Sequence, residues 1–242
     1  MKGKKSLLFF LIIAILALVI MGCTKENNEV ISPQDNLEKD ILVVASTSWT
    51  ALIAEAAGAQ NVRIIAPVEL RHPPEYDFKP SDLKAVQDAD WVVMAGYEPF
   101  MKKMLEANSI DDNKIIQIRT TNTYDNLIQQ TESIAAKLGT ENIQINWVNE
   151  FESAIDHIIE KANASETSSI RVLVHTHLVD FTKSLGYDVV GVFGAEELSP
   201  AKIGELASLN PDLIIDNYHN PQGLGIAEIS GSPRVELRNF PG

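Results

Sequence analysis

The stretch NVRIIAPVELRHPPEYDFKPSDLKAVQDADWVVMA, residues 61–95, sets the pattern for most of this chain of 242 residues. An apolar run, Val62–Val68, leads into a loop that contains His72, and a helix-forming segment, Asp82–Asp88, follows. A second apolar run, Trp91–Ala95, comes next. Short continuous apolar runs are typical of strands buried on both faces. The stretch therefore predicts a parallel strand, helix, strand unit.

The same alternation continues on both sides of this stretch. Strands are predicted at Ile41–Ala45, Val62–Val68, Trp91–Ala95 and Lys114–Ile118, and again at Arg171–Val174, Asp188–Phe193, Asp212–Asp216 and Arg234–Leu237. Helices are predicted between them at Trp49–Ala57, Asp82–Asp88 (with Ser81 as its cap), Phe100–Ala107, Val179–Leu185, Ala201–Leu209 and Gly225–Ile229. This order indicates two parallel α/β lobes.

The segment between the two halves has no strand pattern. A short helix is predicted at Leu127–Leu138, and apolar residues at helical spacing predict a longer one at Trp147–Ala162. We expect this long helix to join the lobes and to pack against both, with a ligand cleft between the lobes. The predicted domains are an N-terminal lobe at 40–123, a helical connector at 124–165 and a C-terminal lobe at 166–242.

The first 22 residues have the features of a secretory signal. Three lysines precede an apolar run that ends at Cys23. The sequence VIMGC, residues 19–23, resembles a bacterial lipobox, which implies a lipid on Cys23 and an extracytoplasmic protein anchored to the bacterial cell membrane. The alternative is an uncleaved anchor, although the run is short for a span, which needs about 20 residues. Residues 23–39 are polar and predict a flexible tether.

Charge and cysteine content narrow the classes of ligand. The full chain carries a net charge of −13, and without the signal it has 17 Lys and Arg against 33 Asp and Glu, or −16. An acidic surface argues against a nucleic-acid partner, which requires a basic footprint. Cys23 is the only cysteine, so the mature chain has no disulfide, and any metal must be bound by His, Asp or Glu.

Three histidines follow predicted strands: His72, His175 and His219. In open parallel sheets ligands bind at the carboxyl ends of the strands. Three imidazoles there suit a divalent metal of borderline softness. Taken singly, each has an ordinary alternative, because His72 can stack on Pro73 and His219 can be held by Asx turns.

Other polar residues near strand ends are weaker candidates. His177 faces the same side as His175 only if the chain stays extended, so we expect only one of the two in the cleft. His157 lies within the long helix and is interpreted as structural. The acidic candidates for a metal are Glu75, Glu196 and Asp216; Glu196 is otherwise part of a solvated loop, and Asp216 is otherwise a turn cap.

Two segments carry a family resemblance. The sequences HPPEYDFKPSDLKAVQDADWVVMAGYEPFMKKML (72–105) and VLVHTHLVDFTKSLGYDVVGV (172–192) resemble the cluster A-I metal-binding lipoproteins, the solute receptors of zinc and manganese ABC importers. The resemblance covers roughly Ile41–Asn217. The spacing from His175 to Gly186 matches that of the family, which selects His175 over His177 as the metal ligand.

Two features depart from the family pattern. The family has a middle histidine that should fall within Ile118–Tyr124, where this chain has IRTTNTY. Its last carboxylate should fall within Glu236–Asn239, where the match is poor. His219 is the candidate to replace a missing ligand, and the other interpretations are an incomplete site or one suited to a different metal.

The resemblance implies a monomeric receptor, not an enzyme, that captures a divalent metal and passes it to an ABC permease. Zn²⁺ is favoured, with Mn²⁺ or Fe²⁺ as alternatives. The second hypothesis is a receptor of the same architecture for a metal chelate such as a siderophore, haem or corrinoid, which would need a wide cleft lined with Trp, Tyr and Arg. The third is a zinc-dependent hydrolase built on His175, His177 and Asp180, for which no further motif or activated nucleophile is present.

Overall fold

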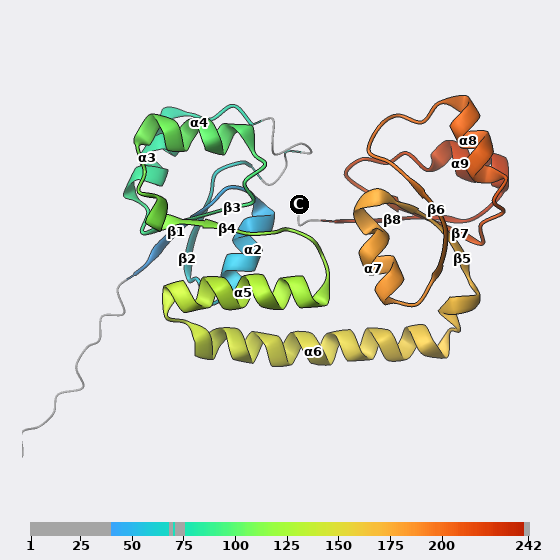
Figure 1. Ribbon diagram of the computed structural model, residues 1–242, viewed down its shortest axis with the longest axis horizontal. Helices are drawn as coiled ribbons and strands as arrows, with labels where there is room; N and C mark the ends of the chain where they lie inside the picture. The colour runs from blue at the N-terminus through green and yellow to red at the C-terminus, as the bar shows by residue number, and fades with distance from the viewer. Residues whose placement is uncertain (1–39, 68–69, 71–75, 240–242) are drawn as a thin grey trace, which may run out of the picture. The chain divides into compact units, whose positions relative to one another are not determined.

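The computed structural model describes residues 40–67, 70 and 76–239. They form two four-stranded sheets, with all strands parallel (Figure 1). The first sheet has the order β2-β1-β3-β4 and the second β6-β5-β7-β8. The first contains β1 Leu42–Ala45, β2 Asn61–Ile64, β3 Trp91–Met94 and β4 Ile115–Gln117, and the second β5 Arg171–His175, β6 Asp188–Phe193, β7 Leu213–Asn217 and β8 Arg234–Leu237. The predicted fold class of two parallel α/β lobes is confirmed.

Helices cover both faces of the first sheet. Val43 and Val44 are both fully buried, but they belong to two different core clusters on opposite faces of β1. One face packs against α2 Ser48–Ala56 and α5 Tyr124–Leu138, and the other against α3 Pro80–Asp88 and α4 Pro99–Asn108. Burial on both faces explains why these strands are apolar without alternation.

The second sheet is covered unequally by the helices that the structure describes. On one face Leu206 of α8 Pro200–Ala207 and Ile226 of α9 Leu224–Ser230 pack against the sheet. On the other face the packing residues are Leu178 and Val179, at the start of α7 Val179–Ser184. This face therefore has one described helix, where each face of the first sheet has two.

Two boundaries in the first lobe differ from the prediction. β2 ends at Ile64 rather than at Val68. The N–H groups of Ile65 and Ala66 still donate to Ala45 and Ser46, but Pro67, which follows, has no N–H to continue the ladder. The cap assigned to Ser81 is wrong: α3 begins at Pro80, and the N-cap position is Lys79. Proline favours the first turn of a helix, which explains the earlier start.

The two helices within the predicted connector are longer than predicted. α5 begins at Tyr124 instead of Leu127 and ends at Leu138 as predicted, with Gly139, at φ +74°, as its C-cap. The long helix α6 spans Glu141–Ala164, 24 residues, and begins six residues before the predicted start at Trp147. In this first part Ile143 and Ile145 are exposed, and Gln144 is the buried side chain of α6.

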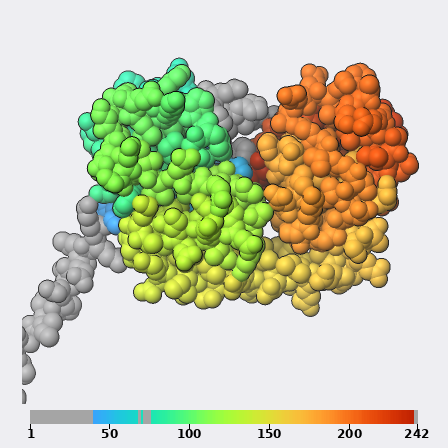
Figure 2. All heavy atoms as spheres, viewed as in Figure 1, coloured from blue at the N-terminus to red at the C-terminus, as the bar shows by residue number. Residues whose placement is uncertain are grey.

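The packing expected of the long helix is only half correct. α6 packs side by side with α5 (Figure 1 and Figure 2). Towards α7, its Ile158 and Ile159 are more than a third exposed and line a cavity of about 760 Å³. Phe181 and Leu185 lie on the other side of this cavity. The expected close packing against the second lobe is therefore wrong for this part of α6. Within residues 40–67, 70 and 76–239, no helix is long and apolar enough to span a membrane.

Gly96 lies after β3, at a position where a larger residue should lower the stability of the first lobe. Its φ is +88°, and a Cβ there would lie 2.1 Å from Nε2 of Gln117. We expect Gly96→Ala to lower the free energy of unfolding by about 1–3 kcal/mol, measured by urea denaturation. The control is Gly204→Ala in α8, where a Cβ meets nothing within 4 Å; it should be neutral or stabilising by up to about 1 kcal/mol. Equal effects of the two variants would contradict the strain assigned to Gly96.

Candidate metal site

The order of the strands identifies where a ligand should bind in each lobe. In the first sheet the chain moves from β1 outward to β2 and then returns to β3 on the other side of β1. In the second it moves from β5 to β6 and returns to β7. The carboxyl ends of β1 and β3, and of β5 and β7, are therefore switch points, where open α/β sheets bind ligands.

A buried carboxylate holds the switch point of the first lobe. Glu98 is 1% exposed, and its Oε1 accepts hydrogen bonds from the Ser46 hydroxyl at 2.6 Å and the Ala95 N–H at 3.0 Å. Its Oε2 accepts from the Gly96 N–H at 2.7 Å. These bonds join the ends of β1 and β3. Glu98 was not among the predicted site residues, and its position between Gly96 and Pro99 is the local signal for it.

His175 is the last residue of β5 and is fully buried. Its Nδ1 accepts the N–H of His177 at 3.3 Å, and the edge of its ring meets Phe193, with centroids 5.6 Å apart. Within the described residues its Nε2 has no hydrogen-bond partner. Burial, and next the nearby His177, lower the pKa of His175 to about 4, while Asp216 acts in the opposite direction. His175 is therefore a neutral, buried imidazole at the switch point.

His177 lies in a different environment. After β5 the chain does not stay extended but turns into a 3₁₀ helix, η4 Thr176–Leu178. The condition under which both histidines would face the same side is therefore not met. His177 is exposed and lines the cavity between α6 and α7, although its ring centroid is 5.1 Å from that of His175. The two histidines thus differ in burial.

His219 lies in the loop after β7 and is 8% exposed. Its backbone N–H donates to Asn217 Oδ1 at 2.9 Å, which is the Asx-type turn that the sequence suggested. Its Nδ1 lies 3.0 Å from Oδ1 of Asn239. Because an amide oxygen only accepts, Nδ1 is the donor, and in the neutral ring Nε2 keeps a lone pair.

Asp216 is fully buried, and its oxygens already accept several hydrogen bonds. The donors are the N–H groups of Asn217, Gln222 and Gly223 and the guanidinium of Arg234, at 2.7–3.1 Å. A Cβ on Gly223 would lie 3.0 Å from Oδ2 of Asp216, so the absence of a side chain at Gly223 lets its backbone approach this carboxylate. Asp216 thus holds the loop that carries His219, the turn role that the sequence left open. Glu196, the other acidic candidate of this lobe, is exposed in the loop after β6.

The remaining candidates cannot be placed in the same way. His72, Glu75 and Cys23 lie outside the described residues. Tyr76, the first described residue after His72, donates from its hydroxyl to Asp82 at 2.9 Å and meets Phe100 edge-on. Tyr76 therefore contacts both α3 and α4. Among the residues that the structure describes, no three His, Cys, Asp or Glu side chains gather around a point suited to a metal ion.

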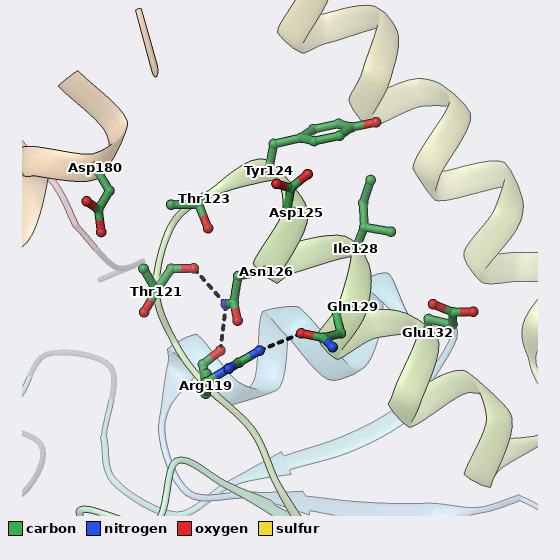
Figure 3. Close-up of a pocket in the computed structure, with 10 residues that line it drawn as sticks. All are labelled: Arg119, Thr121, Thr123, Tyr124, Asp125, Asn126, Ile128, Gln129, Glu132 and Asp180. Carbon is green, nitrogen blue, oxygen red and sulfur yellow. Dashed lines mark hydrogen bonds between the residues drawn. The ribbon is translucent and has the colours of Figure 1, made fainter. Parts of the chain in front are cut away.

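The loop where the family resemblance expects a histidine is polar instead. The Nδ2 of Asn126 donates to the carbonyls of Arg119 and Thr121 at 3.0 and 2.8 Å, and Arg119 donates to Gln129 (Figure 3). These residues line a pocket of about 740 Å³, which Asp180 of α7 borders from the other side. The described part of the pocket contains no histidine, in agreement with the sequence.

Comparisons with known proteins agree with this architecture. Residues 43–145 match the ZnuA family, described as zinc-uptake complex component A, periplasmic. The metal-dependent lipoprotein YcdH from Bacillus subtilis superimposes with a TM-score of 0.64 at 14% identity, over 84% of this chain and 89% of YcdH. FpvC from Pseudomonas aeruginosa, in complex with Mn²⁺, gives 0.62 at 17% identity, over 82% and 88%. The Zn(II)-bound ZnuA-like domain of Streptococcus pneumoniae AdcA gives 0.60 at 16% identity, over 83% and 88%.

The chain has the fold of the ZnuA-like solute-binding proteins. No curated protein sequence matches it. The match to zinc-uptake component A agrees with the preference for a receptor over the hydrolase. The ZnuA match covers the first lobe, including Glu98, and the start of α6.

The buried His175 predicts a pH dependence of stability. The unfolded chain titrates this histidine near its ordinary pKa of about 6.5, whereas its pKa in the fold is about 4. Between these values the unfolded state binds more protons, so stability is lost as pH falls through this window. We expect His175→Gln, studied without metal, to flatten the rise in unfolding free energy from pH 4 to 6.5 by up to about 3 kcal/mol.

Urea denaturation at several pH values measures this slope. His157→Gln is the matched control, because His157 is exposed on α6, and it should keep the slope of the wild-type protein. A His175→Gln variant with an unchanged slope would show that burial does not lower the pKa of this imidazole.

Proposed function

We propose that this protein is an extracytoplasmic receptor that captures a divalent metal ion, with Zn²⁺ favoured, and delivers it to an ABC importer. The observation that carries the proposal is His175: a neutral, fully buried imidazole at the switch point of a ZnuA-like fold, whose Nε2 has no partner among the described residues. An unsatisfied buried polar atom costs about 1–3 kcal/mol. Coordination of a metal would remove this cost.

The proposed ligands are His72, His175 and His219. His219 is already in the tautomer that presents Nε2. His175 is not, because its Nδ1 accepts the His177 N–H and the ring proton therefore lies on Nε2. Binding at Nε2 would move that proton to Nδ1 and break the long contact of 3.3 Å. Protons compete with the metal for these nitrogens, so affinity should fall as pH drops.

Zinc is favoured over manganese by the ligand chemistry. Imidazole nitrogens suit zinc, whereas manganese prefers more carboxylate oxygens. In the second lobe the oxygens of Asp216 are committed to N–H donors, and Glu196 is exposed. Glu75 and Glu196 stay proposals for a fourth ligand.

Calorimetric titration of residues 24–242 with Zn²⁺, Mn²⁺ and Fe²⁺ tests the metal proposal. We expect tight binding of Zn²⁺, and a loss of about 100-fold or more for His72→Ala and for His175→Ala, since each removes a direct ligand and even residues behind ligands contribute 10–100-fold. His219→Ala should weaken binding by at least tenfold.

His157→Ala is the control and should bind as the wild-type protein does, because His157 is exposed on α6. If the wild-type protein binds none of these ions, or if His72→Ala and His175→Ala both bind normally, the metal function is wrong. Binding of haem or of an iron–siderophore complex by such a protein would instead support a chelate receptor.

The lipid anchor is a separate proposal. In a bacterial host, the full chain should appear in the membrane fraction and incorporate labelled palmitate, because a lipid on Cys23 would hold it there. Cys23→Ser should remove the label. Label on the Cys23→Ser variant, or its absence from the wild-type protein, would contradict lipidation at this cysteine.

A further inference from the structure

One asparagine contacts both the loop histidine of the second lobe and a loop of the first. Asn239 follows β8 and is 6% exposed. Its side-chain oxygen lies 3.0 Å from Nδ1 of His219, and its backbone carbonyl accepts from Nδ2 of Asn122 at 2.5 Å. Asn122 belongs to the loop between β4 and α5. These contacts are buried or partly buried, so water competes with them little.

We propose that Asn239 is a positioning residue: it holds His219 in the tautomer that presents Nε2 to a metal ion, and it ties this histidine to the first lobe through Asn122. The part of the proposal that concerns metal rests on the proposed function, since it takes His219 as a ligand. The tautomer and the tie between the lobes do not depend on it.

The direction of the hydrogen bond fixes the tautomer. The amide oxygen of Asn239 has no proton to give, so Nδ1 of His219 must carry one. The opposite tautomer would bring two lone pairs together in a buried place, where the repulsion is poorly screened. Ligating histidines commonly donate their other N–H to an oxygen in this way, which sets the ring orientation and increases the basicity of the ligand atom.

The backbone of the loop fixes the ring from a second side. The N–H of His219 donates to Asn217, and the loop beyond it is held by Asp216. The backbone at His219 is therefore already held in place, and Asn239 determines the orientation of the ring and which ring nitrogen carries the proton.

The contact with Asn122 extends the arrangement to the first lobe. Asn122 follows Thr121, whose carbonyl accepts from Asn126 of α5. The bonds thus run from His219 through Asn239 to the loop where the family resemblance predicts a histidine. In this chain the side-chain amide of Asn122, rather than an imidazole, extends from that loop and donates to Asn239 of the second lobe.

Nitrogen-15 NMR of the ring nitrogens in the metal-free protein, with His219 assigned from a His219→Gln sample, tests the tautomer. The wild-type ring should carry its proton on Nδ1. Asn239→Leu should give a mixture of tautomers, and Asn239→Asp, which keeps an acceptor, should restore the wild-type form. The control is Asn220→Leu in the same loop, whose side chain donates to Ala195 instead; it should leave the tautomer unchanged. A wild-type ring protonated on Nε2 overturns the proposal.

Zinc titration of the same samples tests the role in binding. We expect Asn239→Leu to weaken binding by about 10–100-fold and Asn239→Asp to keep it within about threefold of the wild-type value, with Asn122→Ala weakening binding without changing the tautomer. Unchanged affinity in Asn239→Leu would overturn the positioning role. If the wild-type protein binds no metal, the proposed function fails, while the tautomer result still decides the role of Asn239.

Discussion

The geometry of both lobes depends on one buried carboxylate at each switch point. Parallel strands end with backbone N–H groups that the sheet does not satisfy, and burying them unpaired is costly. Glu98 satisfies two such groups and a hydroxyl in the first lobe. Asp216 accepts three N–H groups and a guanidinium in the second. Each carboxylate therefore joins segments of the chain that meet at the switch point of its lobe.

This use of the carboxylates explains why imidazoles are left for the ligand. A carboxylate that already accepts several N–H bonds has little capacity for a cation, whereas a neutral imidazole needs only one free lone pair. The two histidines of the second lobe are prepared to different degrees. His219 has its lone pair placed by Asn239, while His175 must change tautomer. In the proposed site, His219 would therefore bind with less reorganisation than His175.

The sequence was sufficient for the order of elements but not for the contacts at the switch points. Each strand that the structure describes was predicted, and β6 and β8 have the predicted bounds. The histidine after β7 and its Asx turn were also foreseen, since turn chemistry is local. Glu98 was missed because its partner Ser46 is 52 residues away, and no local pattern reports such a contact. The early part of α6 was missed because exposed isoleucines interrupt the amphipathic pattern.

The unequal cover of the two sheets accounts for the cavity beside α6. In the first lobe, α5 packs against the sheet through Ile134 and Ala135, and against α6 through Tyr124, whose ring stacks on Phe151. In the described part of the second lobe, the corresponding face has α7 alone, so Ile158 and Ile159 of α6 line a cavity rather than a packed core. Contacts across a cavity contribute little to stability. The bond from Asn122 to Asn239 is a polar contact that joins the lobes beside the proposed metal ligand His219.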